Sequence, residues 1–290
     1  MAAGNGTAAP LRTVWLCADD YGIAPGVNRG IRDLIARGRL SGTSVMVTAP
    51  GFSTAEAQAL TAAAAGRRAA VGLHFTVTAP FRPASSGFRP LGHDGAFPRL
   101  ARMFASGLGR SLDPALLGTE AEAQFAAFEA AFGGPPDYVD GHQHVQVLPQ
   151  VGDALLAVMT RRAPRAWLRQ CGRAVPPWRS LSDPKGLLID RLSVRLRARC
   201  AKSEVATNPA FAGTYDFSGA KDYEALFGGF LRGLPDGSVV MCHPGFVDDE
   251  LRRLDPFTDM REHEHAFFAG ERFPAVLTEH GIALAHGATK

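Results

Sequence analysis

Short apolar runs and helical patterns alternate along most of the chain, and this alternation limits the possible folds more than any other feature. Eight runs have the length and the apolar or β-branched composition of strands: residues 13–20, 42–49, 69–77, 138–144, 166–171, 204–208, 238–243 and 282–286. Strands that alternate with helices pair in parallel, because each crossover helix packs back onto the sheet. The sequence therefore predicts an α/β fold built on a parallel sheet.

The segments between these runs carry helical periodicity. Seven such patterns occur, at residues 25–37, 54–65, 119–132, 151–162, 185–201, 222–231 and 262–280. The first is the clearest, with Val27, Ile31 and Leu34 on one face and Gly38 as its stop. Eight strand–helix units suit a β/α barrel, whereas five or six would suit an open doubly wound sheet. We expect a distorted, TIM-like parallel (β/α) barrel that spans residues 1–290 as a single domain.

Residues 80–117 interrupt this alternation. The segment is rich in Gly, Pro, Ser and Arg, and it has no strong periodicity. It is also longer than an ordinary connection between a strand and a helix. We expect an insertion that covers the active face and decides specificity.

Bulk composition excludes several classes of protein. The 290 residues are 46% hydrophobic and 20% charged, which is typical of a globular chain. A net charge of +3 does not indicate a nucleic-acid partner. Residues 1–12 lack the features of a signal peptide, and no apolar stretch is long enough to span a bilayer. We expect a cytoplasmic protein without a transmembrane segment, and the sequence leaves a homodimer open.

One segment, residues 185–202, concentrates basic residues among leucines. Arg191, Arg195, Arg197 and Arg199 lie within it. Such a helix can make peripheral contact with an anionic membrane or a lipid-linked substrate. A solvated basic face is the simpler interpretation, because the chain has only one such segment.

Polar residues follow the apolar cores of several predicted strands. Asp19 and Asp20 end the first strand, His74 ends the third, and His243 ends the seventh. His142 and His144 end the fourth. Parallel barrels carry their chemistry at the carboxyl ends of the strands, so we expect all these side chains at one rim.

Adjacent carboxylates at the end of the first strand suggest two different roles. Side chains of neighbouring strand residues point to opposite faces unless the chain is already turning, and Gly22 provides freedom to turn. One aspartate can then bind a metal while its neighbour stays ionised beside the cation and accepts a proton from water. The alternative is that one carboxylate caps the helix that begins near Pro25 and the other is solvated.

The histidines of the third and fourth strands complete a possible metal site. In an extended segment the spacing of His142 and His144 places both rings on one side. Asp140 can orient one ring from outside the coordination sphere. Together with the Asp19–Asp20 pair and His74 they predict a site of two imidazoles and one carboxylate, with positions left for water. His74 alone could equally be a core histidine with its hydrogen bonds satisfied.

Three further residues follow strand-like runs. His243 can act as the general acid that protonates a departing amine, or it can stabilise the turn at Pro244. Arg169 and Asn208 can bind sugar hydroxyls or an oxyanion, or they can fix loops by hydrogen bonds to main-chain carbonyls.

Taken as a set, these motifs resemble the YdjC-like carbohydrate deacetylases, a family that includes chitooligosaccharide deacetylases and a hopanoid-biosynthesis branch. The matching segments are residues 18–22, 25–31, 43–47, 72–75, 140–145 and 241–246, which come in the family's order and cover most of the chain. The resemblance implies a distorted β/α barrel and one divalent ion, magnesium or zinc, on Asp20, His74 and His142. It also implies that Asp19 is the catalytic base. Gln143 and Gln146 interrupt the family's histidine-rich motif, which favours His142 over His144 as the ligand.

The activity that this resemblance implies is hydrolysis of the acetamide of an N-acetylated amino sugar, on an oligosaccharide or a glycolipid. The ion would polarise the carbonyl, Asp19 would take a proton from water, and His243 would protonate the nitrogen. Metal-dependent phosphoester hydrolysis is one alternative, although it commonly needs two ions and more carboxylates. A non-catalytic sugar-binding barrel is the other, but binding alone would not require both Asp19 and Asp20.

Overall fold

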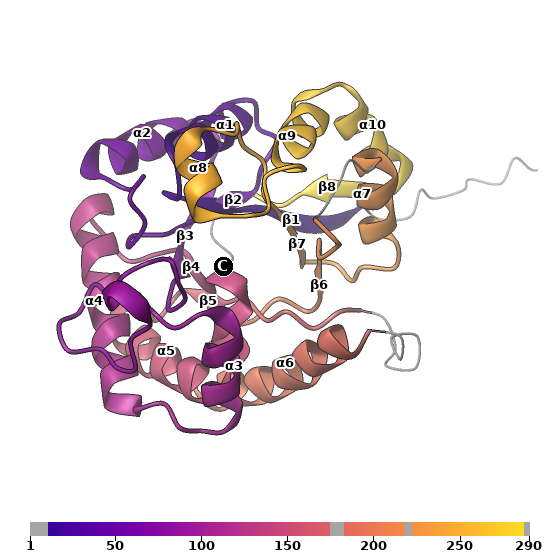
Figure 1. Cartoon of the computed structure of the whole chain (residues 1–290). Helices are drawn as coiled ribbons and strands as arrows, with labels where there is room; N and C mark the ends of the chain where they lie inside the picture. Colours follow the sequence, from indigo (N-terminus) through magenta and orange to yellow (C-terminus); the bar gives the residue numbers. More distant parts are fainter. Residues whose placement is uncertain (1–10, 175–182, 218–221, 287–290) are drawn as a thin grey trace, which may run out of the picture.

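The computed structural model describes residues 11–174, 183–217 and 222–286 as a curled parallel sheet surrounded by helices (Figure 1). The strands are β1 (Arg12–Tyr21), β2 (Gly42–Val45), β3 (Ala70–Phe75), β4 (Tyr138–Gly141), β5 (Trp167–Leu168), β6 (Phe211–Ala212), β7 (Ser238–Cys242) and β8 (Ile282–Leu284). Their order in the sheet is β5-β4-β3-β2-β1-β7-β6, and β8 pairs with the beginning of β1. The expected distorted β/α barrel is confirmed, in the form of a half-barrel.

The helices connect consecutive strands and cover the outside of the sheet. They are α1 (Pro25–Ala36), α2 (Thr54–Ala65), η1 (His93–Gly95), α3 (Leu100–Leu108), α4 (Pro114–Phe132), η2 (His142–Val147), α5 (Pro149–Arg162), α6 (Pro184–Lys202), α7 (Tyr223–Leu231), α8 (Asp249–Leu254), α9 (Arg261–Ala269) and α10 (Arg272–Glu279). This order reproduces the alternation read from the sequence.

Strand β1 lies at the centre of the sheet and is buried on both faces. It pairs with β2 on one side and with β7 on the other, and every residue from Val14 to Tyr21 is buried. A strand covered on both faces cannot alternate apolar and polar residues, which is why its sequence is a continuous apolar run. Asp19 and Asp20 stand at its carboxyl end, where charge is least expected in such a run.

The predicted sixth strand, residues 204–208, is wrong. These residues lie beside β5, where Leu168 N donates to the Ala206 carbonyl oxygen at 2.9 Å. Two residues further on, Gln170 N donates to the Asn208 side chain at 2.9 Å instead of to a carbonyl oxygen. Because a side chain replaces the main-chain acceptor here, residues 204–208 form no strand. The next strand is β6, which pairs with β7.

Two other expectations need correction. The predicted helix at residues 262–280 is two helices, α9 and α10, which are separated at Gly270. Residues 80–117 are not without helical structure, because they contain η1, α3 and the beginning of α4. Helix α3 is amphipathic but only nine residues long, and an apolar pattern of that length does not by itself distinguish a helix from a strand.

Helix α6 contains the basic segment that the sequence singles out. Leu192 and Leu196 are buried against the protein, whereas Arg191, Arg195 and Arg197 are exposed. The apolar face is therefore used in packing, which agrees with a solvated basic face. Among the described helices none is both long and apolar enough to cross a membrane.

Gly72 in β3 offers a test of how tightly the sheet packs beneath the site. A Cβ atom at this position would lie 2.6 Å from the buried Tyr138 ring, which itself stacks on Trp167. We expect Gly72→Ala to lower the free energy of unfolding by ~1–3 kcal/mol, because the aromatic stack has no room to move. Urea denaturation measures this change.

Gly118 is the matched control, since it lies inside α4 and a Cβ atom there would have no neighbour within 4 Å. Gly118→Ala should raise the free energy of unfolding by ~0.5–1 kcal/mol, because alanine favours the helix. Equal effects of the two substitutions would contradict the packing argument.

Candidate active site

The carboxyl ends of the strands surround a cavity of about 320 Å³. Its lining consists of Asp19, Asp20, His74, Leu100, His142, Gln143, His144, Phe217, Met241, His243, Asp255, Phe257, Met260, Arg261 and Glu264. Six residues predicted for the strand-end rim, Asp19, Asp20, His74, His142, His144 and His243, are all in this set. Side chains from β1, β3, the end of β7 and the segment after β4 therefore meet at one rim, as predicted.

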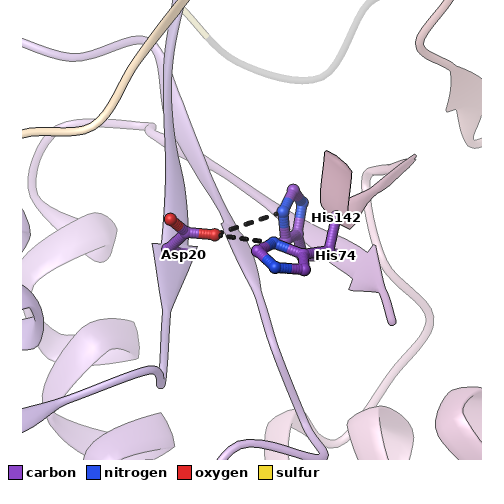
Figure 2. Close-up of side chains that lie close together, drawn as sticks. All are labelled: Asp20, His74 and His142. Carbon is purple, nitrogen blue, oxygen red and sulfur yellow. Dashed lines mark hydrogen bonds and ion pairs between the residues drawn. The ribbon is translucent and has the colours of Figure 1, made fainter. Parts of the chain in front are cut away.

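Asp20, His74 and His142 point toward a common centre (Figure 2). The Oδ1 atom of Asp20 lies 3.4 Å from His74 Nε2 and 3.2 Å from His142 Nδ1. One carboxylate oxygen and two imidazole nitrogens, all within 4.8 Å of one another, form a donor set suited to a divalent cation.

The backbone turns at Asp20 itself rather than at Gly22 alone. Asp20 has φ of 70°, and the pairing of β1 with β2 changes register between Ala18 and Tyr21. Aspartate tolerates the left-handed region better than most residues, and the irregularity redirects its side chain. As a result Asp19 and Asp20 both face the cavity, although neighbours on a regular strand would not.

Two of the three ligand side chains, His74 and Asp20, are oriented by a partner behind them. His74 Nδ1 lies 2.6 Å from Asp140 Oδ1, which leaves Nε2 for the centre. Asp20 Oδ2 accepts a hydrogen bond from Arg261 Nη2 at 2.6 Å, which leaves Oδ1 for the centre. Arg261 is held in turn by Asp255. Such outer contacts fix the ligands before a cation arrives.

The structure contradicts the reason given for pairing His142 with His144. Residues 142–147 form η2, not an extended segment, and Gln143 and His144 have φ of 55° and 61°. His142 consequently faces Asp20, whereas His144 Nδ1 lies 3.4 Å from Cys171 Sγ. Burial and the nearby Arg169 lower the pKa of His144 to about 3, so its ring is neutral.

Asp19 is held by a buried arginine. Arg169 donates from Nη1 and Nη2 to the two Asp19 oxygens at 2.6 and 2.7 Å, and Nη1 also lies 2.9 Å from Asp140. Burial alone would raise the pKa of Asp19, but the guanidinium outweighs it and lowers the pKa to about 2. Arg169 is fully buried and does not line the cavity, so it orients Asp19 rather than reaching a ligand.

A second group of possible ligands, Asp19, His74 and Asp140, lies close by. The Arg169 guanidinium already bridges its two carboxylates. A cation placed there would meet an existing positive charge at hydrogen-bonding distance. The group around Asp20 is therefore the better candidate for a metal.

The buried charges favour an additional cation at this place. Asp19, Asp20 and Asp140 are buried together, with Arg169 and Arg261 as the guanidiniums that contact them. Burial alone would lower the pKa of His74, but the Asp140 and Asp19 carboxylates outweigh burial and raise it to about 10. The donor set and the surrounding charge therefore both fit a divalent ion.

His243 lies at the end of β7 with its ring at the cavity. Its Nδ1 atom is buried and has no hydrogen-bond partner in the part of the chain that the structure describes. Burial and the Arg261 charge keep the pKa of His243 below its ordinary value despite the attraction of Asp20. The ring is neutral at pH 7, so it must gain a proton before it can act as an acid.

Asn208 is placed away from the cavity. Its side-chain nitrogen donates to the carbonyl oxygens of Gln170 and Ala210, and its oxygen accepts from Gln170 N. All its hydrogen-bonding groups serve the loop between α6 and β6. Of the two roles considered for Asn208, the structure supports the fixing of a loop.

Three charged residues of the cavity wall were not predicted from the sequence: Asp255, Arg261 and Glu264. Arg261 and Glu264 belong to α9, and Asp255 follows α8. None follows a strand, so the strand-end pattern could not select them. For the two helix residues the signal in the sequence is their spacing, because Arg261, Glu264 and the buried Phe268 recur at helical intervals on one face of α9.

This chain is similar in sequence to proteins of a known family. A family model described as YdjC-like protein matches residues 13–279. A chitooligosaccharide deacetylase of Yersinia pestis (strain Pestoides F) is 29% identical over 238 residues, which are 81% of this chain and 82% of that protein.

Two solved structures share the fold. One, from Enterococcus faecalis V583 and provisionally named for cellobiose-phosphate cleavage, has a TM-score of 0.69 at 21% identity and covers 95% of this chain and 97% of its own. The other, a lactam utilization protein from Thermus thermophilus, has a TM-score of 0.50 at 15% identity over 97% of this chain and 100% of its own. At these identities the likeness concerns the fold alone.

The metal site can be tested by comparing two histidines of the same short segment. We expect His142→Asn to weaken zinc binding, measured by isothermal titration calorimetry, by more than about 100-fold, because it removes a ligand. His144→Asn should leave the affinity nearly unchanged, since its ring contacts Cys171 instead. If the two substitutions weakened binding equally, the assignment of His142 would be wrong.

Proposed function

Because this chain belongs to the YdjC-like protein family, we propose that it is a carbohydrate deacetylase that hydrolyses the acetamide of an N-acetylated amino sugar. The observation that carries the proposal is the convergence of Asp20, His74 and His142 in one cavity with Asp19 beside them. The activity named for the Yersinia relative is consistent with it.

The residues present fit one divalent ion, and we propose magnesium or zinc on Asp20, His74 and His142. Bound there, the ion would supply Lewis-acid chemistry: it would polarise the acetyl carbonyl and make the attacking water more acidic. Arg261 and Asp140 hold the ligand atoms in place for it.

Asp19 is the proposed base. The bidentate contact with Arg169 keeps its carboxylate ionised and fixes its orientation at the cavity wall. A carboxylate with such a low pKa is a weak base, so it can accept a proton only from a water molecule whose own pKa is lowered. Asp19 accepts one proton as the water oxygen bonds to the acetyl carbon.

His243 is proposed to carry that proton to the departing nitrogen. Its neutral ring can accept a proton, and Nε2 is the nitrogen left for the cavity because Nδ1 is buried. The carbon–nitrogen bond then breaks, the amine takes the proton, and acetic acid is released, which ionises to acetate at neutral pH. The proton lost by water thus balances the proton gained by nitrogen.

Apolar side chains in the cavity wall are suited to a sugar. Leu100, Phe217 and Phe257 line the cavity, and Phe257 is half-exposed. Sugar rings pack their C–H faces on such apolar and aromatic surfaces. Leu100 belongs to the segment 80–117, and Phe81 of the same segment packs its ring against His142. We propose that this segment contributes to specificity.

Phosphoester hydrolysis is the weaker candidate. Enzymes of that class commonly hold two ions about 3.5–4 Å apart. Beside the proposed site, the second set of carboxylates already binds the Arg169 guanidinium.

Acetate release from N-acetylglucosamine oligomers tests the proposed function directly. We expect acetate and free amine in equal amounts, and we expect a chelator to abolish the reaction until zinc or magnesium is restored, because the ion activates both reactants. Release that persists in chelator would contradict the metal-dependent mechanism. Phosphate release from sugar phosphates without acetate release would favour the phosphoesterase alternative.

Asp19→Asn tests the proposed base. The amide keeps the size of the carboxylate but cannot accept the proton, so kcat should fall by about 10²–10⁴. Zinc affinity should change little, because Asp19 is not in the proposed ligand set. A variant that retained full activity would exclude Asp19 as the base.

A further inference from the structure

One buried carboxyl in the cavity wall has no part in the mechanism above. Glu264 of α9 is fully buried. Its Oε1 accepts a hydrogen bond from Tyr215 Oη at 2.5 Å, and its Oε2 accepts one from His243 N at 2.6 Å. A single side chain thus joins helix α9, the loop after β6 and the end of β7.

Two routes lead from this carboxyl to His243. The first is the hydrogen bond to the His243 main chain. The second runs through two rings, because Tyr215 packs on Phe217 with ring centroids 4.1 Å apart. Phe217 in turn meets the His243 imidazole edge to face, at 5.2 Å and 88°. Glu264 therefore fixes both the backbone and, by packing, the ring.

His243 needs this support because its ring lacks the hydrogen bond that usually orients a proton-transferring histidine. Histidines that transfer protons are generally oriented by a hydrogen bond to the second ring nitrogen. The Nδ1 of His243 has no such partner within residues 11–174, 183–217 and 222–286. Packing against Phe217 is thus the contact available to set the angle of the ring.

We propose that Glu264 is a positioning residue that holds His243 in the orientation used for proton transfer. This inference rests on the proposed function, which gives His243 its role. Glu264 lies on a helix rather than at the end of a strand, and it acts on His243 through Tyr215 and Phe217.

The energetics of the carboxyl agree with a functional reason for its position. Burial raises the pKa of Glu264 to about 7, against the hydrogen bonds from Tyr215 and His243 N and the charge of Arg261. These contacts therefore offset only part of the desolvation cost of its charged form. An apolar residue would avoid that cost, but it could not accept two hydrogen bonds.

Three substitutions separate positioning from simple packing. Glu264→Ala removes both contacts, and kcat for acetate release should fall by roughly tenfold or more while KM changes little. Glu264→Gln can accept from His243 N and donate to Tyr215 Oη, so it should recover most of the activity. Tyr215→Phe keeps the ring stack but loses the hydroxyl, and its kcat should fall between these two values.

Glu262 is the matched control on the same helix. It also accepts a main-chain hydrogen bond, from Val247 N at 3.0 Å, but it is exposed and lies outside the cavity lining. Glu262→Ala should leave kcat unchanged. A comparable loss in this variant would mean that any disturbance of α9 lowers activity, and it would overturn the proposal.

Imidazole resonances of ¹⁵N-histidine-labelled protein give a readout that does not depend on activity. His243→Gln identifies the His243 signal among the nine histidines. We expect Glu264→Ala and Tyr215→Phe to shift this signal and its titration, because the Phe217 ring moves relative to the imidazole. Glu264→Gln and Glu262→Ala should preserve it.

The two readouts distinguish the possible failures. If the signal shifts as expected but the parent protein releases no acetate, the positioning role stands and the proposed function fails. If the parent is active and Glu264→Ala lowers kcat without moving the His243 signal, positioning is excluded. Unchanged kcat in both Glu264→Ala and Tyr215→Phe would exclude it as well.

Discussion

The structure of the site depends on a buried network in which carboxylates and guanidiniums neutralise one another. Charged groups are costly to bury unless each is paired at short range. Arg169 meets Asp19 and Asp140, and Arg261 meets Asp20. These contacts occupy the carboxylate oxygens that face away from the proposed metal position. What remains directed toward it is one oxygen of Asp20 and the imidazoles beside it, which is the arrangement that a divalent ion requires.

The fold divides the work between strands and helices. Strands β1, β3 and β7 deliver Asp19, Asp20, His74 and His243 to one rim, because parallel strands all end on the same side. Helix α9 delivers Arg261 and Glu264 from the outside of the barrel. The strands thus supply the groups proposed to react, and the helix supplies groups that orient them. This division explains why α9 carries buried charge where it lines the cavity.

Much of the architecture could be predicted because it follows from local patterns. The continuous apolar run of β1 and the apolar face of α1 show directly in the sequence which residues are buried. The prediction of the sixth strand was wrong for a physical reason. The Asn208 side chain takes the place of a main-chain acceptor, and no pattern of hydrophobicity indicates such an exchange. The expectation of an extended segment at residues 142–144 was wrong likewise, since Gln143 and His144 have positive φ and kink the chain there.

The sequence by itself determined the type of fold and the end of the sheet at which the polar side chains gather, since both follow from periodicity and from the direction of parallel strands. It also indicated the types of ligand through Asp20, His74 and His142. Only the tertiary structure decided which partners set their charge and orientation: Arg169 is 150 residues from Asp19, and Arg261 is 241 residues from Asp20. Pairing between such distant residues depends on how the helices and strands pack, and packing is a property of the whole chain rather than of any segment.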